Sequence, residues 1–262
     1  MHFTKMHGLG NDYIYLDCTQ GEPPDLPALA VQLSDRHRGV GGDGLICICP
    51  SETADFKMRI FNADGSEGEM CGNGIRCVGK YVYDKGLTRG RELEIETLAG
   101  VRTLRLAVAD GLVSAVTVDM GVPRVEQAVT LTVGGRDWRG TTVSMGNPHL
   151  AVFLEDVAAL NLAALGPGFE RHPRFPGRVN TEFIRVRSPG LLELRVWERG
   201  SGETLACGTG ACAALAAAVT AGYTSRQAEA RLPGGSLALR WREDGHMEMT
   251  GPAVTVFEGE IG

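Results

Sequence analysis

Two stretches of the chain decide how it is organised: RIFNADGSEGEMCGNGIRCVGKYVYDKG at residues 59–86 and RVWERGSGETLACGTGACAALAAAVTAG at residues 195–222. Each begins with a short segment rich in β-branched and aromatic residues, typical of a strand, and continues through a turn to a Cys-Gly-x-Gly element and a helical pattern. Cys71 and Cys207 are 136 residues apart (207 − 71), and Gly86 and Gly222 each end a helical pattern 15 residues later. The chain therefore contains a duplicated strand–loop–helix unit.

Shorter matches extend the repeat. Gly10-Asn11 recurs as Gly146-Asn147 at the same offset of 136, and Arg36-His37 recurs as Arg171-His172 at an offset of 135. The patterns predict helices over about 73–85 and 209–221, and further strands over 103–108, 113–119, 129–133, 183–187, 236–241 and 254–257.

The repeat predicts a mixed fold, α/β (α+β), of two pseudo-symmetric domains. The turn-rich residues 121–123 near the midpoint are the natural boundary. We expect one domain to comprise residues 1–118 plus 253–262, with the C-terminal segment returning to it, and the other to comprise residues 119–252.

Composition excludes several classes of protein. With 262 residues, 43% hydrophobic and 22% charged, the chain is neither disordered nor a disulfide miniprotein. The net charge is −6 with no basic cluster, which favours a small-molecule ligand over nucleic acid or an anionic membrane.

Residues 205–225 carry no charge but are too poor in large apolar residues for a membrane span, so they predict a tightly surrounded helix. The N-terminus lacks the pattern of a signal peptide, so we expect a cytoplasmic protein whose seven cysteines are thiols.

The paired cysteines point to proton-transfer chemistry. A cysteine just before a helix lies beside free backbone N–H groups, which stabilise a thiolate and lower the thiol pKa from about 8.5 toward neutrality. The same N–H groups bind carboxylates. Two such halves would bring Cys71 and Cys207 to face one another, an arrangement suited to removing a proton from one face of a carbon and delivering one to the other.

Other interpretations of the cysteines are packing and metal ligation. A single Cys-Gly before an alanine-rich helix is usually a packed small residue, but here the cysteine persists in both copies while its neighbours differ. The Cys-x5-Cys and Cys-x4-Cys spacings within helices lack the turn spacing of common zinc sites, so we expect no metal. The remaining cysteines are expected to be packing residues: Cys18, Cys47, Cys49, Cys77 and Cys212.

At these residues the chain resembles the diaminopimelate epimerase family, pyridoxal-independent enzymes that interconvert LL- and meso-2,6-diaminopimelate on the lysine and peptidoglycan pathways. The resemblance covers essentially the whole length. The motifs that carry it are HGLGND at 7–12, NADGS at 62–66, CGNGIRC at 71–77, GNPH at 146–149, ERGSGET at 198–204 and CGTG at 207–210.

The resemblance implies two domains, each a curled, mostly antiparallel sheet or barrel around a central helix, with the active site in the cleft between them. It implies a homodimer and no cofactor. Cys71 and Cys207 would be the acid–base pair, with His149 and Glu198 tuning their proton affinities. Substrate-binding residues would be Asn11, Asn62, Gly72, Asn73, Asn147, Asn180, Glu198, Arg199, Gly208 and Thr209. Many members carry glutamine where this chain has Gly44, so that contact is not carried over.

Two alternatives stay open from the sequence. A proline racemase-like enzyme would share the Cys-Gly-Thr-Gly element. Free proline, however, has no distal carboxylate for Glu198 and Arg199 to recognise. A non-catalytic amino-acid-binding or zinc-binding module is the alternative from another class.

Overall fold

The computed structural model describes residues 1–262, and the chain divides into two compact units. The first comprises residues 1–118 and 251–262, and the second comprises residues 119–250. None of the helices is both long and apolar enough to cross a membrane.

In the first unit, eight strands follow one another in the order β18-β1-β2-β3-β4-β6-β7-β8, and β5 pairs with β4. The β2–β3 and β4–β6 pairs are parallel and the others antiparallel. The elements are β1 (His2–Gly8), β2 (Asn11–Asp17), α1 (Leu26–Ser34), β3 (Gly44–Cys49), β4 (Phe56–Asn62), β5 (Glu67–Gly68), α2 (Gly72–Asp84), β6 (Glu92–Glu96), β7 (Arg102–Ala109), β8 (Leu112–Asp119) and β18 (Val254–Glu260).

The second unit repeats this topology, with strand order β9-β10-β11-β12-β13-β15-β16-β17 and β14 paired with β13. Again two pairs are parallel, β11–β12 and β13–β15. The elements are β9 (Arg124–Val133), β10 (Arg136–Ser144), β11 (Pro148–Phe153), α3 (Leu162–Glu170), β12 (Asn180–Ser188), β13 (Leu191–Glu198), β14 (Gly202–Thr204), α4 (Gly208–Thr220), β15 (Gln227–Leu232), β16 (Gly235–Trp241) and β17 (Met247–Gly251).

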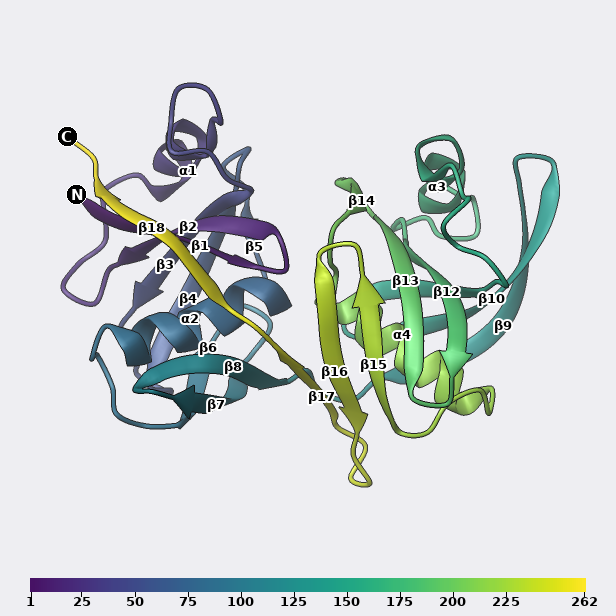
Figure 1. The fold of residues 1–262 in the computed structure, drawn as a ribbon. Helices are drawn as coiled ribbons and strands as arrows, with labels where there is room; N and C mark the ends of the chain where they lie inside the picture. The colour runs from purple at the N-terminus through teal and green to yellow at the C-terminus, as the bar shows by residue number, and fades with distance from the viewer. The chain divides into compact units, whose positions relative to one another are not determined.

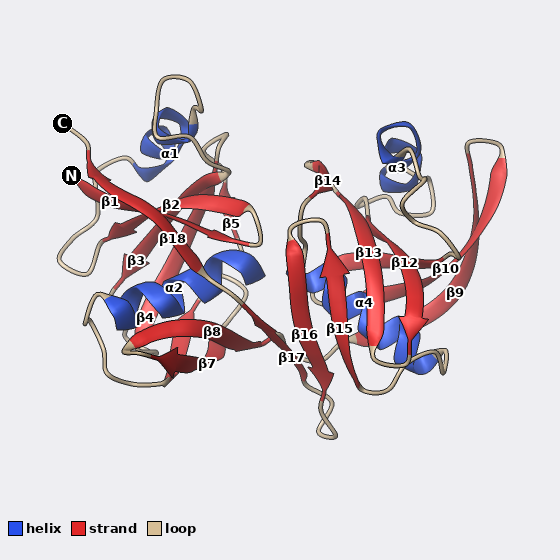
Figure 2. Ribbon diagram, viewed as in Figure 1, coloured by secondary structure: helices blue, strands red, loops and turns tan.

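Each unit has one long helix against the concave side of its sheet, α2 in the first and α4 in the second (Figures 1 and 2). Both are buried over most of their length. The small side chains of α4, Ala213 to Ala218 with one leucine, are at most 1% exposed, which explains the charge-free stretch. Gly86 and Gly222 follow the two helices with φ of +74° and +75°, a conformation that suits glycine at a helix C-terminus.

A shorter helix, α1 or α3, packs on the opposite face of each sheet (Figure 2). Arg36 and Arg171, one of the repeated pairs, lie just after these two helices. The C-terminal strand β18 pairs with β1 as β9 pairs with β10, so the end of the chain completes the first unit.

The predicted fold class, α+β with two pseudo-symmetric halves, is confirmed. The central helices begin and end one residue earlier than predicted, at 72–84 and 208–220, because Cys71 and Cys207 occupy the N-cap positions.

Candidate active site

Cys71 caps the N-terminus of α2 in the first unit. Its Sγ accepts a hydrogen bond from the backbone N–H of Gly74 at 3.3 Å and donates to Asn11 Oδ1 at 3.2 Å. Asn73, which is 3% exposed in the first turn of α2, donates from Nδ2 to the same Asn11 oxygen at 3.5 Å. The structure thus brings together the predicted residues Cys71, Asn11, Gly72 and Asn73, at a helix N-terminus that suits an anion.

The orientation of the Asn11 side chain is set by Asp43. Asn11 Nδ2 donates to Asp43 Oδ2 at 2.7 Å, and an ionised carboxylate only accepts, so the amide oxygen must face the thiol. Arg36 holds the carboxylate in turn, at 2.9 Å from Asp43 and 2.8 Å from Asp12. Burial raises the pKa of Asp12, but Arg36 and Lys5 outweigh it and hold that pKa below its usual value.

Asn62 and Gly44 lie beside this cluster along the sheet. Gly44, the first residue of β3, pairs with Tyr13 on one side and Asn62 on the other. Asn62 is exposed and its Nδ2 donates to Ser66 Oγ at 3.0 Å rather than to another predicted site residue. Gly44 leaves no space for a side chain, since a Cβ there would lie 2.1 Å from the Phe61 carbonyl oxygen.

Cys207 caps α4 in the second unit, but its environment differs. Its Sγ lies 3.5 Å from Thr209 Oγ1, and the residue is 5% exposed. Burial, together with the carboxylates of Glu198 and Glu182, raises the pKa of the Cys207 thiol well above its usual value. The expectation of a lowered pKa is therefore wrong for Cys207, because burial and two nearby acids outweigh the helix N-terminus.

His149 and Asn147 form a hydrogen-bonded chain leading to that thiol. His149 Nδ1 lies 2.7 Å from Glu182 Oε1, and its Nε2 lies 3.0 Å from Asn147 Oδ1. Asn147 Nδ2 then donates to Thr209 Oγ1 at 3.4 Å. The predicted residues Asn147, His149, Thr209 and Cys207 therefore lie in one connected cluster.

The remaining predicted residues of this unit lie at the ends of β12 and β13. Asn180 Oδ1 accepts from the Arg199 backbone N–H at 2.9 Å, which fixes the turn that carries Arg199. The Arg199 side chain is exposed and its Nη1 lies 3.5 Å from the Gly177 carbonyl oxygen. Glu198 Oε1 accepts from Thr204 Oγ1 at 2.5 Å.

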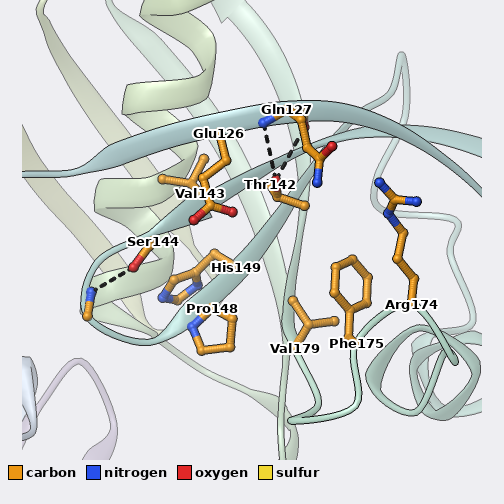
Figure 3. Close-up of a pocket in the computed structure, with 11 residues that line it drawn as sticks. Glu126, Gln127, Thr142, Val143, Ser144, Pro148, His149, Arg174, Phe175 and Val179 are labelled. Atoms are coloured by element: carbon orange, nitrogen blue, oxygen red, sulfur yellow. Dashed lines mark hydrogen bonds between the residues drawn. The ribbon is translucent and has the colours of Figure 1, made fainter.

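His149 also lines a cavity of about 580 Å³ within the second unit. Figure 3 shows Ser144, Pro148 and His149 at one end of it and Arg174 and Phe175 at the other. The His149 side chain itself has 0% exposure, so it borders this cavity without being open to it.

The five cysteines predicted to be packing residues are buried and form no disulfide. Burial raises the pKa of Cys77 to about 11. The seven thiols form no disulfide in the structure, and no group of three His, Cys, Asp or Glu side chains is arranged to hold a metal ion.

Asp43 and Glu182 are not among the site residues that the sequence predicts. Both occupy positions that the 136-residue offset compares directly: Asp43 corresponds to Val179, and Glu182 corresponds to Ile46. The sequence did contain a signal for both residues: each is an acidic residue in one copy of the repeat where the other copy has an apolar residue. In the case of Glu182 the acidic residue also lies inside a buried strand.

The chain matches known proteins over nearly its whole length. Residues 3–126 and 141–256 match the family model described as diaminopimelate epimerase. The chain is 50% identical over 275 residues to the diaminopimelate epimerase of Acetivibrio thermocellus, covering 100% of this chain and 98% of that protein. It is 51% identical over 276 residues to that of Methanococcus maripaludis strain C5, covering 100% and 99%.

Solved structures share the fold at low sequence identity. A phenazine biosynthesis protein of the PhzF family from Bacillus anthracis aligns with a TM-score of 0.77 at 17% identity, covering 100% of this chain and 98% of that one. A hydroxyproline epimerase from Agrobacterium vitis aligns with a TM-score of 0.74 at 17% identity, covering 100% and 90%.

Proposed function

The chain belongs to the diaminopimelate epimerase family, and from that premise we propose that it interconverts LL- and meso-2,6-diaminopimelate with Cys71 and Cys207 as its acid–base pair. The observation that carries the proposal is the matched placement of the two thiols. Each caps a buried helix of 13 residues, at equivalent positions of a repeated fold. The activity belongs to lysine and peptidoglycan precursor biosynthesis.

In the proposed mechanism one sulfur, as thiolate, removes the α-proton, and the other, as thiol, delivers a proton to the opposite face. The roles exchange in the reverse direction, so no net proton is consumed. The carbanion that forms beside the α-carboxylate is stabilised by the free N–H groups of the helix N-termini, at Gly72 and Asn73 and at Gly208 and Thr209. This chemistry uses no metal and no pyridoxal phosphate.

The environment of Cys207 must be accommodated in this mechanism. Burial and two carboxylates disfavour its thiolate and raise its pKa. Glu198 contributes to this rise directly, whereas the Thr209 hydroxyl, at the end of the hydrogen-bonded chain from His149, lowers the pKa of Cys207.

The remaining polar residues are proposed to bind the ends of the substrate. Asn11, Asn62, Asn147 and Asn180 would hold its amino and carboxylate groups. The exposed Arg199, on a turn anchored by Asn180, would bind the distal carboxylate through two parallel hydrogen bonds. Glu198 beside it would accept from an ammonium group.

Uptake of deuterium at the α-carbon tests the reaction. Incubation in D₂O with LL-diaminopimelate should label the substrate and form the meso isomer, whereas L-proline should remain unlabelled. Cys71→Ala and Cys207→Ala should each abolish epimerisation, and Cys212→Ala, a buried cysteine of α4, is the matched control. Full epimerase activity in either of the first two variants contradicts the two-thiol mechanism.

We propose further that the enzyme is a cytoplasmic homodimer. Seven free cysteines suit a reducing compartment. On β18 the side chains of Val256 and Phe257 are 53% and 46% exposed, apolar area that a second copy would cover. Sedimentation should give a dimer that Val256→Asp shifts toward monomer; a monomeric wild-type protein contradicts the proposal.

A further inference from the structure

The pair His149 and Glu182 lies in the interior of the second unit, where both side chains have 0% exposure. Their Nδ1 and Oε1 atoms are 2.7 Å apart. The second carboxylate oxygen, Glu182 Oε2, is buried with no hydrogen-bond partner. An uncompensated negative charge in such a place is costly, so the two side chains together must be electrically neutral.

Neutrality determines where the protons lie. Either the ring is an imidazolium beside a carboxylate, or Glu182 is protonated on Oε1 and donates to Nδ1 of a ring that carries its hydrogen on Nε2. A hydrogen on Oε2 instead would have no acceptor, because that buried oxygen has no partner. In both arrangements Nε2 has a hydrogen, which agrees with its 3.0 Å contact to the acceptor Asn147 Oδ1. Burial raises the pKa of Glu182, which also favours retention of the shared proton.

The other charged groups around His149 and Glu182 do not change the requirement that the pair be electrically neutral. Glu198 on β13 adds a second negative charge nearby, which opposes the loss of a proton from Glu182. Burial raises the pKa of Cys207 at the start of α4, and this residue adds no positive charge to the surroundings of the pair. Glu126 and Arg174, which line the cavity beside His149, are both exposed to solvent and of opposite charge.

The hydrogen on Nε2 orients the rest of the chain toward Cys207. It binds the amide oxygen of Asn147 and therefore turns the amide NH₂ toward Thr209 Oγ1, at 3.4 Å. With that acceptor site occupied, the Thr209 hydroxyl hydrogen is available to the Cys207 sulfur, 3.5 Å away. The chain thus presents a donor to Cys207.

In the first unit the corresponding asparagine, Asn11, has its side-chain amide oriented the other way. The residues at the matching positions are Tyr13 and Ile46, which form no such pair. There Asp43 binds the NH₂ of Asn11, so that the Asn11 oxygen accepts a hydrogen bond from Cys71. The two paired asparagines therefore present opposite ends of their amides to the two half-sites.

We propose that Glu182 is a positioning residue of the Cys207 half-site: by keeping a hydrogen on His149 Nε2, it fixes the Asn147 amide with its NH₂ toward Thr209. The inference rests on the proposed function for its kinetic consequence, but not for its structural one. It makes His149 a fixed hydrogen-bond donor rather than a base that accepts a proton from the thiol.

The test compares wild-type protein with Glu182→Gln and Glu182→Asp. Glu182→Gln has the same shape but removes the ionisable group, so the single ring hydrogen is no longer confined to Nε2. Nitrogen-15 NMR of histidine-labelled protein, with His149 assigned from a His149→Gln sample, should show a protonated Nε2 in the wild type at neutral pH. In Glu182→Gln the Nε2 resonance should shift toward that of a nitrogen without a hydrogen.

In D₂O exchange assays, kcat of Glu182→Gln should fall about tenfold or more with little change in KM, since loss of a buried charged hydrogen bond has effects of this order. Glu182→Asp retains the carboxylate and should keep the protonated Nε2 signal. Glu248→Gln, at another buried glutamate of the same unit, paired with Arg242, should keep kcat.

An unprotonated Nε2 in the wild type overturns the proposal, as does wild-type kcat in Glu182→Gln or an unchanged His149 spectrum in that variant. If Glu182→Gln does not fold, loss of the protonated Nε2 signal in Glu182→Asp overturns it. A wild-type protein that does not turn over diaminopimelate refutes the proposed function alone, because the NMR measurement needs no substrate.

Discussion

Gly44 is a position at which we expect even the smallest side chain to have a large effect. Its φ is not positive, so an L-residue can adopt the local conformation, and the conflict is one of space alone. A Cβ would lie 2.1 Å from the Phe61 carbonyl oxygen and 2.9 Å from Tyr13 Cε1, well inside contact distance. The carbonyl belongs to β4 and cannot rotate away as a flexible side chain could.

Gly44→Ala must therefore push β3 away from β4. Overpacking of this kind costs about 1–3 kcal/mol of unfolding free energy, and more where backbone has to move. At roughly 3–5 °C per kcal/mol for a unit of this size, the melting temperature should fall by about 3–15 °C. Asn62 pairs with Gly44 across those strands, so KM for diaminopimelate should also rise.

Calorimetry and steady-state kinetics on Gly44→Ala, Gly44→Gln and Gly90→Ala check this prediction. Gly90 is the matched control, because a Cβ there would meet its neighbours at 3.4 Å, an ordinary contact. Gly44→Gln should be at least as destabilised as Gly44→Ala, because it carries the same Cβ. If Gly44→Ala melts with the wild type, the close approach of β3 and β4 is not a constraint and the reasoning is refuted.

Two further predictions concern the thiol environments. Asp43→Asn replaces the carboxylate that can only accept from Asn11 Nδ2, so the Asn11 side-chain amide can flip and exchange the positions of its oxygen and nitrogen. We expect kcat to fall about tenfold. An unchanged kcat would show that the amide is held by other contacts. Glu198→Gln removes a negative charge that raises the pKa of Cys207, so the pH at which iodoacetamide alkylates Cys207 should move down. Glu203→Gln, at a surface glutamate paired with Arg195, should leave that pH unchanged, and a shift upward in Glu198→Gln would reverse the inferred sign.

The duplication could be predicted from the sequence because the residues that repeat are the ones that turns and helix ends require. Gly86 and Gly222 end the two helices with positive φ, and Cys71 and Cys207 cap them. Such positions depend on local backbone geometry, which a single stretch of chain specifies. The alternating strands were recognisable for the same reason, although their pairing was not.

The carboxylates that bind site residues in the two units, Asp43 and Glu182, could not be predicted in this way. Strand β12 lies beside β11 in parallel, so Glu182 reaches His149 although 33 residues separate them. Asp43 likewise reaches Asn11 across 32 residues because β2 and β3 are parallel neighbours. Neither contact follows from a local pattern, since a parallel pairing joins segments that the intervening helix separates.

The sequence by itself determined that two thiols occupy equivalent helix starts in a repeated α+β unit. Only the tertiary structure decided that the two thiols differ. Cys71 donates to the oxygen of an amide whose NH₂ is bound by Asp43, whereas Cys207 lies buried near two carboxylates that raise its pKa. The reason is physical: backbone geometry is encoded locally, but the proton affinity of a side chain depends on burial and on charges that distant strands bring beside it.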